Sequence, residues 1–224
     1  MKILRAVLID DHPLIVDAYR QGIAKIAENR GIPFDIVEIN SLKEAERFFR
    51  EESEILKSTD LVFLDISLPI DENKKFLSGE DIGIRLRKDF PETRIIISTS
   101  FSDNFRIYNI LRSVDPDGFL LKRNLTPYEL LTAIDNILNN PPYYSKSILQ
   151  LFRKQINSDQ ILDDLDRRLL YELSIGTKMK DIPGLLPLSM AGVERRKRNL
   201  RLIFDIHTDR DAALIKVARE KGFI

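Results

Sequence analysis

Short hydrophobic runs alternate with amphipathic stretches over the first 140 residues of the chain. The hydrophobic runs lie at 3–9, 35–39, 61–64, 94–99 and 118–121. The stretches between them carry apolar residues at helical spacing and lie at 13–28, 42–51, 80–88, 103–113 and 127–138. Continuous apolar strands joined by helices of about ten or more residues indicate a parallel sheet covered on both faces. The pattern therefore predicts a three-layer α/β sandwich built on a five-stranded parallel sheet.

Residues that favour helix starts agree with these boundaries. Ser41, Asp103 and Thr126 each precede a helical stretch and can accept a hydrogen bond from its first free backbone amides. Pro13 and Pro127 suit the first turn, where the missing amide hydrogen costs nothing.

The pattern changes after residue 140. The prolines in Asn139-Asn140-Pro141-Pro142 stop the fifth helix. We expect a domain at 1–140, a linker with some helix of its own at 141–160, and a small all-helical domain at 161–224. Breaks in the helical domain lie at Gly176, at 187–189 and near 205–209.

Composition adds limits to this picture. No stretch has the roughly 18 to 20 consecutive apolar residues of a membrane helix, and no signal peptide is recognisable at the N-terminus, so we expect a cytoplasmic protein. The absence of cysteine excludes disulfides and thiolate chemistry. The net charge is zero, but residues 161–224 hold 13 Lys+Arg against 10 Asp+Glu, and a basic cluster stands at 195–198 with Arg201.

Five polar residues stand at the ends of four of the predicted strands. Asp10 and Asp11 end the first run, Asp65 the third, Thr99 the fourth and Lys122 the fifth. Because ligands of open α/β sheets bind at the carboxyl ends of the strands, we expect one pocket there. Clustered carboxylates repel one another unless a cation such as Mg²⁺ offsets them. The lysine and the threonine hydroxyl can hold phosphoryl oxygens, which makes Asp65 a candidate nucleophile and phosphorylation site.

Simpler interpretations exist for the same residues. An aspartate at a strand end is usually a cap or turn residue, and Asp-Asp before a proline could be only a turn. Ser98 competes with Thr99 for the hydroxyl role, although strand alternation favours Thr99. His12 is interpreted as a turn residue. The coincidence of several strand ends favours the pocket.

Three segments resemble the receiver domain of bacterial two-component response regulators. They are Val7 to Leu14, Phe63 to Pro69 and Gly118 to Lys122, and the Asp-Asp-His-Pro sequence is similar to the NarL/FixJ subfamily. The resemblance implies a flavodoxin-like fold and a regulator, not an enzyme, that a sensor histidine kinase phosphorylates.

The resemblance also implies roles for single residues. Mg²⁺ would be held by Asp11, Asp65 and the carbonyl of Ser67, with Asp10 nearby through water. Thr99 and Phe119 would be the switch residues, and Lys122 would bind the phosphoryl group.

One segment departs from the receiver pattern. Receivers commonly place a glycine about four residues after the proline that follows the acceptor, whereas residues 70–78 separate Pro69 from Gly79 here. We interpret this insertion of about six residues as a tolerated surface loop. A role in kinase recognition or in shielding the phosphoryl group is the second hypothesis.

The helix after Ser189 has one apolar and one basic side. At about 100° per residue, Val193, Leu200 and Phe204 share a face. Arg195 and Arg198 lie opposite, with Glu194 and Asn199 beside them and Arg196 and Lys197 on the shoulders. A solvated helix face is the simple alternative; insertion into the major groove of DNA is the functional one. The predicted DNA contacts are Ser189, Glu194, Arg195, Arg196, Lys197, Arg198, Asn199 and Arg201.

The segment from Gly176 to Ser189 resembles, without gaps, the LuxR-type helix-turn-helix, and the last helix resembles that family's dimer surface. Pro183 and Gly184 fall in the middle of the scaffold helix, which should be short or kinked. The favoured function is a phosphorylation-dependent transcription regulator that binds promoter DNA as a homodimer. A phosphorylation-independent regulator is an alternative. A phosphatase of the haloacid dehalogenase type is disfavoured, because it needs a second aspartate where Ser67 stands.

Overall fold

The computed structural model describes residues 3–69, 76–101, 103–154 and 162–224. The chain divides into two compact units. Unit 1 consists of Met1–Ser102 with Ser113–Ile156, and unit 2 of Asp103–Arg112 with Asn157–Ile224. No helix within the described ranges is long and apolar enough to cross a membrane.

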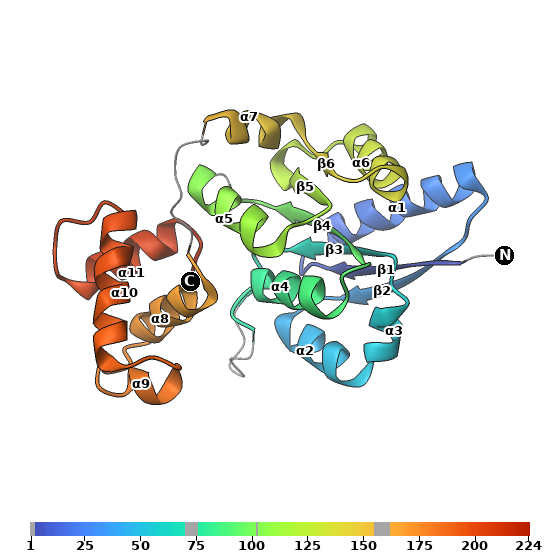
Figure 1. The fold of residues 1–224 in the computed structure, drawn as a ribbon. Helices are drawn as coiled ribbons and strands as arrows, with labels where there is room; N and C mark the ends of the chain where they lie inside the picture. The colour runs from blue at the N-terminus through green and yellow to red at the C-terminus, as the bar shows by residue number, and fades with distance from the viewer. Residues whose placement is uncertain (1–2, 70–75, 102, 155–161) are drawn as a thin grey trace. The chain divides into compact units, whose positions relative to one another are not determined.

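Unit 1 is built on a parallel sheet of six strands in the order β2-β1-β3-β4-β5-β6 (Figure 1). Continuous hydrophobic sequence makes β1, β3, β4 and β5 almost fully buried, as expected for central strands of such a sheet. The strands are β1 Leu4–Ile9, β2 Phe34–Ile39, β3 Leu61–Asp65, β4 Arg94–Thr99, β5 Gly118–Leu121 and β6 Tyr143–Tyr144.

Helices cover both faces of this sheet (Figure 1). One face packs against α1 and α6, whose apolar sides join the strands in one core that includes Tyr19, Ile23, Ile134 and Ile137. The other face carries α2, α3 and α4. The helical bounds are α1 Pro13–Arg30, α2 Leu42–Glu51, α3 Ser53–Lys57, α4 Gly79–Asp89, α5 Asn104–Val114, η1 Lys122–Asn124, α6 Pro127–Asn139 and α7 Lys146–Lys154.

The register of the central strands aligns their carboxyl ends. Ile9 pairs with Leu64 across β1 and β3, Asp65 pairs with Ser98 across β3 and β4, and Thr99 pairs with Leu121 across β4 and β5. The residues that follow these pairs therefore emerge at one edge of the sheet, as the hydrophobic pattern predicts.

The predicted strands and helices of the α/β region are all present, with ends within two residues of their expected positions. The helix caps are also confirmed. Ser41 accepts a hydrogen bond from the amide of Glu44, and Thr126 accepts one from Glu129. Both Pro13 and Pro127 occupy the first turn of a helix.

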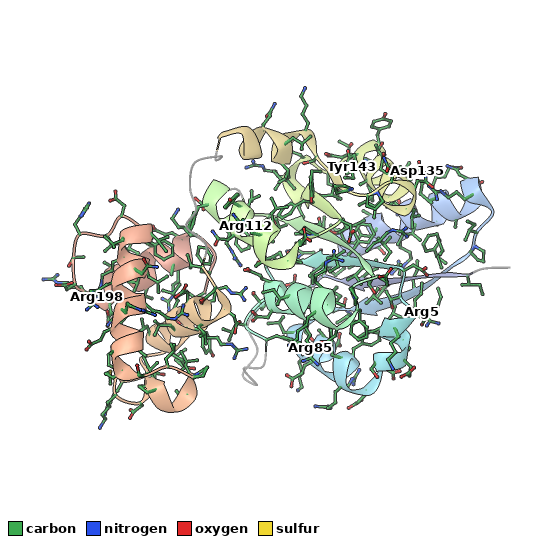
Figure 2. All side chains as sticks on the ribbon, in the orientation of Figure 1. Arg5, Arg85, Arg112, Asp135, Tyr143 and Arg198 are labelled. Carbon is green, nitrogen blue, oxygen red and sulfur yellow. The ribbon has the colours of Figure 1, made fainter. Side chains whose placement is uncertain are left out.

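Three short elements were not predicted from the sequence: β6, the helix α3 and the three-residue turn η1. The sheet has six strands rather than five, because β6 joins β5 from within the segment expected to be a linker. The amide of Tyr143, labelled in Figure 2, donates to the carbonyl of Asp117, and that of Ser145 donates to Phe119. A two-residue strand and the five-residue helix α3 are too short to show a period.

Unit 2 combines α8 Asp164–Ser174, α9 Ile182–Leu185, α10 Met190–Ile203 and α11 Asp211–Glu220 with Asp103–Arg112, a segment that contains most of α5. Its core contains Leu169, Leu170, Val193, Leu200 and Leu214. The scaffold helix α9 has only four residues, which confirms the shortening expected from Pro183 and Gly184.

Candidate functional site

Asp10, Asp65 and Lys122 meet at the carboxyl edge of the sheet. Both carboxylates are almost completely buried, and Lys122 starts the turn that follows β5. The lysine Nζ lies 2.8 Å from Asp10 Oδ2 and 2.7 Å from Asp65 Oδ2. Three segments of the chain thus place two acids and one base in a common pocket, as predicted.

Burial dominates the electrostatics of Asp65. Desolvation raises the pKa of its carboxyl above the ordinary value, and the charge of Asp10 adds to this. The hydrogen bond and charge of Lys122 oppose the shift, as does the amide of Ser67, which donates to Asp65 Oδ1 at 2.8 Å. Because one ammonium group does not fully offset the buried acids, the pocket can accommodate further positive charge.

Asp11 completes the acidic cluster. Its Oδ1 atom is buried without a hydrogen-bond partner. One ligand atom each from Asp10, Asp11, His12 and Asp65 lies within 4.8 Å of the others. A hard divalent cation such as Mg²⁺ prefers oxygen ligands, so an unsatisfied carboxylate oxygen beside two buried acids fits such an ion.

His12 also lies in this pocket, a placement that was not predicted from its sequence. Its ring nitrogen Nδ1 lies 2.8 Å from Asp11 Oδ1, 3.2 Å from Asp10 Oδ1 and 3.9 Å from Asp65 Oδ2. The interpretation as a turn residue alone was therefore incomplete. The position directly after Asp10-Asp11 was the only signal in the sequence, and it does not fix the direction of the ring.

The hydroxyl and aromatic candidates lie on the neighbouring strands. Thr99 and Ser98 are both fully buried at the end of β4, and Thr99 Oγ1 accepts a hydrogen bond from the amide of Phe101 at 3.2 Å. Ser98 is the register partner of Asp65, so both hydroxyl candidates remain close to the pocket in the sheet. Phe119 is fully buried in β5.

In unit 2, α10 has the two faces that the helical wheel predicts. Val193 and Leu200 are fully buried, whereas Glu194, Arg195, Arg198 and Asn199 are exposed. Arg198 is labelled on α10 in Figure 2. Ser189 caps the helix by accepting a hydrogen bond from the amide of Gly192 at 3.1 Å.

The other basic residues of this cluster form ion pairs within unit 2. Arg196 contacts Asp163 Oδ2 at 2.8 Å and Asp166 Oδ1 at 2.7 Å. Lys197 is buried, and its Nζ lies 2.7 Å from Asp211 Oδ1. Arg201 donates to the carboxylate of Asp211 and to the backbone carbonyl of Asp209. These three cations therefore hold α10 to neighbouring segments.

The family model of the response regulator receiver domain matches residues 6–135. The match contains every residue of the acidic pocket. The chain belongs to this family.

Relatives of this response regulator match it over almost its whole length. The transcriptional regulatory protein MctR of Rhizobium johnstonii is 26% identical over 225 residues, which cover 99% of this chain and 95% of the relative. The oxygen regulatory protein NreC of Staphylococcus haemolyticus is 24% identical, and 99% of each chain is covered.

Solved structures of RcsB from Salmonella enterica serovar Typhimurium share the fold. One, bound to promoter rprA in the presence of the phosphomimetic BeF3⁻, has a TM-score of 0.64 at 18% identity and covers 96% of this chain and 98% of its own. A second, bound to promoter P1flhDC in the presence of the same phosphomimetic, has a TM-score of 0.60 at 18% identity, with 99% of each chain covered.

The insertion in the acceptor loop is anchored on its C-terminal side. A Cβ atom on Gly79 would lie 1.9 Å from the backbone oxygen of Asp65, so only glycine fits where α4 begins against the receiver's third strand. Gly79 therefore lies in close contact with the backbone at the end of β3. Residues 70–75 of the 70–78 insertion lie outside the described residues.

Proposed function

We propose that this response regulator accepts a phosphoryl group on Asp65 from a sensor histidine kinase, and that phosphorylation controls promoter binding by unit 2. The supporting observation is the buried pair of Asp10 and Asp65, which Lys122 bridges at 2.8 and 2.7 Å. A buried acid pair that is only partly neutralised is suited to transient binding of a cation and a phosphoryl group.

In the proposed reaction, a carboxylate oxygen of Asp65 attacks the phosphorus of the donor. The new oxygen–phosphorus bond forms as the bond to the donor's leaving atom breaks, which gives an acyl phosphate. The Ser67 amide holds Oδ1, and the Lys122 ammonium holds Oδ2 and then the phosphoryl oxygens. Asp11, Asp65 and the Ser67 carbonyl, with Asp10 close by, would hold Mg²⁺, which supplies positive charge to the transferring group.

The buried hydroxyl of Thr99 and the ring of Phe119 are the proposed switch residues. Thr99 lies on β4, which is next to the strand of Asp65, and Phe119 lies on β5, the strand after it in the sheet. A phosphoryl group that draws the Thr99 hydroxyl toward it would favour one of two arrangements of the loop after β4, where Phe101 donates to that hydroxyl.

The proposed DNA-reading face consists of the exposed residues Glu194, Arg195, Arg198 and Asn199 on α10. Arginine can form paired hydrogen bonds with guanine, and glutamate can accept one from the amino group of cytosine. MctR is a transcriptional regulatory protein and RcsB has been solved in complex with promoters, and both support this proposal. We also propose that the protein binds paired half-sites as a homodimer, as helix-turn-helix regulators do.

Intact-mass measurement after incubation with a small phosphodonor and Mg²⁺ tests the acceptor. The wild type should gain one phosphoryl group, Asp65→Asn should gain none, and Asp17→Asn, which changes a half-exposed residue of α1 outside the pocket, should behave like the wild type. Adducts on both the wild type and Asp65→Asn, or on neither, would contradict the assignment.

DNA binding measured with and without the phosphodonor then separates the two kinds of regulator. A phosphorylation-dependent regulator binds its promoter more tightly when the donor is present, and Asp65→Asn abolishes the difference. Equal affinity under both conditions would favour the phosphorylation-independent alternative.

A further inference from the structure

We propose that His12 is an additional ligand of the divalent cation in the receiver pocket and gives the site a preference for transition-metal ions over Mg²⁺. The proposal rests on the cation site of the proposed function. It concerns only the imidazole that follows the acidic pair.

The distances from the His12 ring nitrogen to the acidic oxygens are similar to those between two ligand atoms of one metal ion. His12 Nδ1 is 2.8, 3.2 and 3.9 Å from oxygens of Asp11, Asp10 and Asp65, respectively. Ligands bound to one octahedral ion at about 2.1 Å are separated by about 3 Å when adjacent and about 4.2 Å when opposite. The three measured distances lie close to that range, so the four atoms can surround one cation with small movements.

The contact between His12 and Asp11 is not a hydrogen bond. Asp11 Oδ1 is buried and lacks a hydrogen-bond partner, although Nδ1 lies only 2.8 Å away. The hydrogen-bonding contact of Nδ1 is with Asp10 Oδ1 at 3.2 Å. His12 Nδ1 and Asp11 Oδ1 therefore lie close together without a hydrogen bond between them, as two neighbouring ligand atoms of one metal ion do.

A nitrogen ligand changes which ions the pocket favours. Mg²⁺ prefers oxygen ligands, whereas imidazole suits ions such as Co²⁺, and affinity for mixed nitrogen and oxygen sites rises from Mn²⁺ to Co²⁺. Nδ1 binds a metal when the ring proton is on Nε2. Since the His12 side chain is 55% exposed, water can satisfy that proton.

Removal of this side chain should leave the fold intact. His12 is the N-cap residue of α1 but makes no side-chain capping hydrogen bond, so His12→Ala breaks no bond of that kind. The chain contains only one other histidine, His207 in unit 2, whose side chain is 87% exposed. His207→Ala is therefore a matched control for loss of an imidazole.

Calorimetric titration of the full-length protein with CoCl₂ and with MgCl₂ tests the proposal without any phosphorylation step. The wild type should bind Co²⁺ more tightly than Mg²⁺. His12→Ala should weaken Co²⁺ binding by about tenfold or more while it changes Mg²⁺ binding by less than about threefold, and His207→Ala should change neither.

Proton NMR of the Co²⁺ complex gives a second measurement. A ligating imidazole shows a strongly shifted exchangeable ring N–H signal, which should be present in the wild type and in His207→Ala and absent in His12→Ala. Equal weakening of both ions by His12→Ala, or unchanged Co²⁺ binding, would overturn the proposal. Failure of Asp65 to accept a phosphoryl group in Mg²⁺ would instead contradict the proposed function and leave this ion preference measurable.

Discussion

At the scale of single residues, the pocket depends on buried polar groups that satisfy one another. Tyr19 stands on α1, stacks on Phe63 with ring centroids 4.4 Å apart, and donates its hydroxyl to Asp10 Oδ2 at 3.3 Å. Burial raises the pKa of the Tyr19 phenol well above its ordinary value, and the negative charge of Asp10 raises it further. Tyr19 therefore stays neutral and donates a hydrogen bond to the Asp10 carboxylate.

This pKa shift predicts how stability changes at high pH. In the unfolded chain Tyr19 loses its proton near pH 10, whereas the folded protein keeps it. The unfolded state then binds fewer protons, so the free energy of unfolding should fall as pH rises above about 10 toward the folded pKa. Tyr19→Phe should make that fall shallower, at a loss of about 1 kcal/mol at neutral pH. Urea unfolding at several pH values measures both effects.

Tyr128 offers the control for this experiment, because its side chain is exposed at the start of α6. Tyr128→Phe should leave the pH dependence of stability as it is in the wild type. The same steep fall in Tyr19→Phe as in the wild type would show that the Tyr19 hydroxyl does not titrate as we expect.

These residues also show what the sequence could predict about the site. Asp10, Asp65 and Lys122 each end a hydrophobic run, so their meeting follows from strand order alone. Tyr19 and His12 gave no such signal, because helical packing and a turn set the directions of their side chains. A residue's role in the pocket was predictable where the backbone decides it and not where a rotamer does.

At the scale of elements, the start of α4 depends on Gly79. A Cβ atom there would lie 1.9 Å from the carbonyl oxygen of Asp65 and 2.9 Å from the Cα of Ile66, both in rigid backbone. Gly79→Ala must move α4 or the acceptor strand. We expect a loss of several kcal/mol in stability, or a displaced acceptor loop with slower phosphorylation of Asp65. Thermal unfolding and phosphorylation rates measure these outcomes.

Gly184→Ala is the matched control for that change. A Cβ atom at Gly184 in α9 would meet nothing within 4 Å, and this residue does not have positive φ. The alanine should be neutral or stabilise the protein by up to about 1 kcal/mol. Equal destabilisation by both substitutions would contradict the steric explanation for Gly79.

Just after the end of α10, a substitution should stabilise the protein instead of destabilising it. Asp205 has a φ of 54°, and the amide of Ile206 donates to the carbonyl of Arg201, which together form the left-handed helix end that glycine favours. Asp205→Gly should raise the free energy of unfolding by about 0.5–1 kcal/mol, because relief of the left-handed cost exceeds the added entropy of the unfolded chain. Denaturant unfolding measures it, and a free energy of unfolding no higher than that of the wild type would contradict it.

Element prediction succeeded where length and caps gave a signal. The helix starts at Ser41, Thr126 and Ser189 could be predicted because each side chain accepts a bond from the first turn. The strand β6 depends instead on tertiary pairing, since Tyr143 reaches the carbonyl of Asp117 across the sheet edge. Its two residues carry no period of their own.

At the scale of the whole molecule, the net charge is zero, so no overall field attracts DNA. Affinity for a promoter should depend on short-range contacts made by the cations of the basic cluster that are not paired inside unit 2. Arg195 and Arg198 are exposed, whereas Arg196, Lys197 and Arg201 are engaged with aspartates. The basic cluster therefore has fewer cations for phosphate contacts than its sequence suggests.

The dependence of DNA binding on salt concentration distinguishes these two groups of cations. Arg198 is exposed, and its charge displaces counterions from DNA, so Arg198→Gln should reduce the slope of log affinity against log salt by up to about 0.9 per subunit. Arg196→Gln should leave the slope unchanged and lower stability by about 1–3 kcal/mol, because Asp166 is buried and would lose its guanidinium partner. Fluorescence anisotropy at several salt concentrations and denaturant unfolding measure the two effects. A smaller slope in Arg196→Gln with unchanged stability would place Arg196 on the DNA and contradict its structural role.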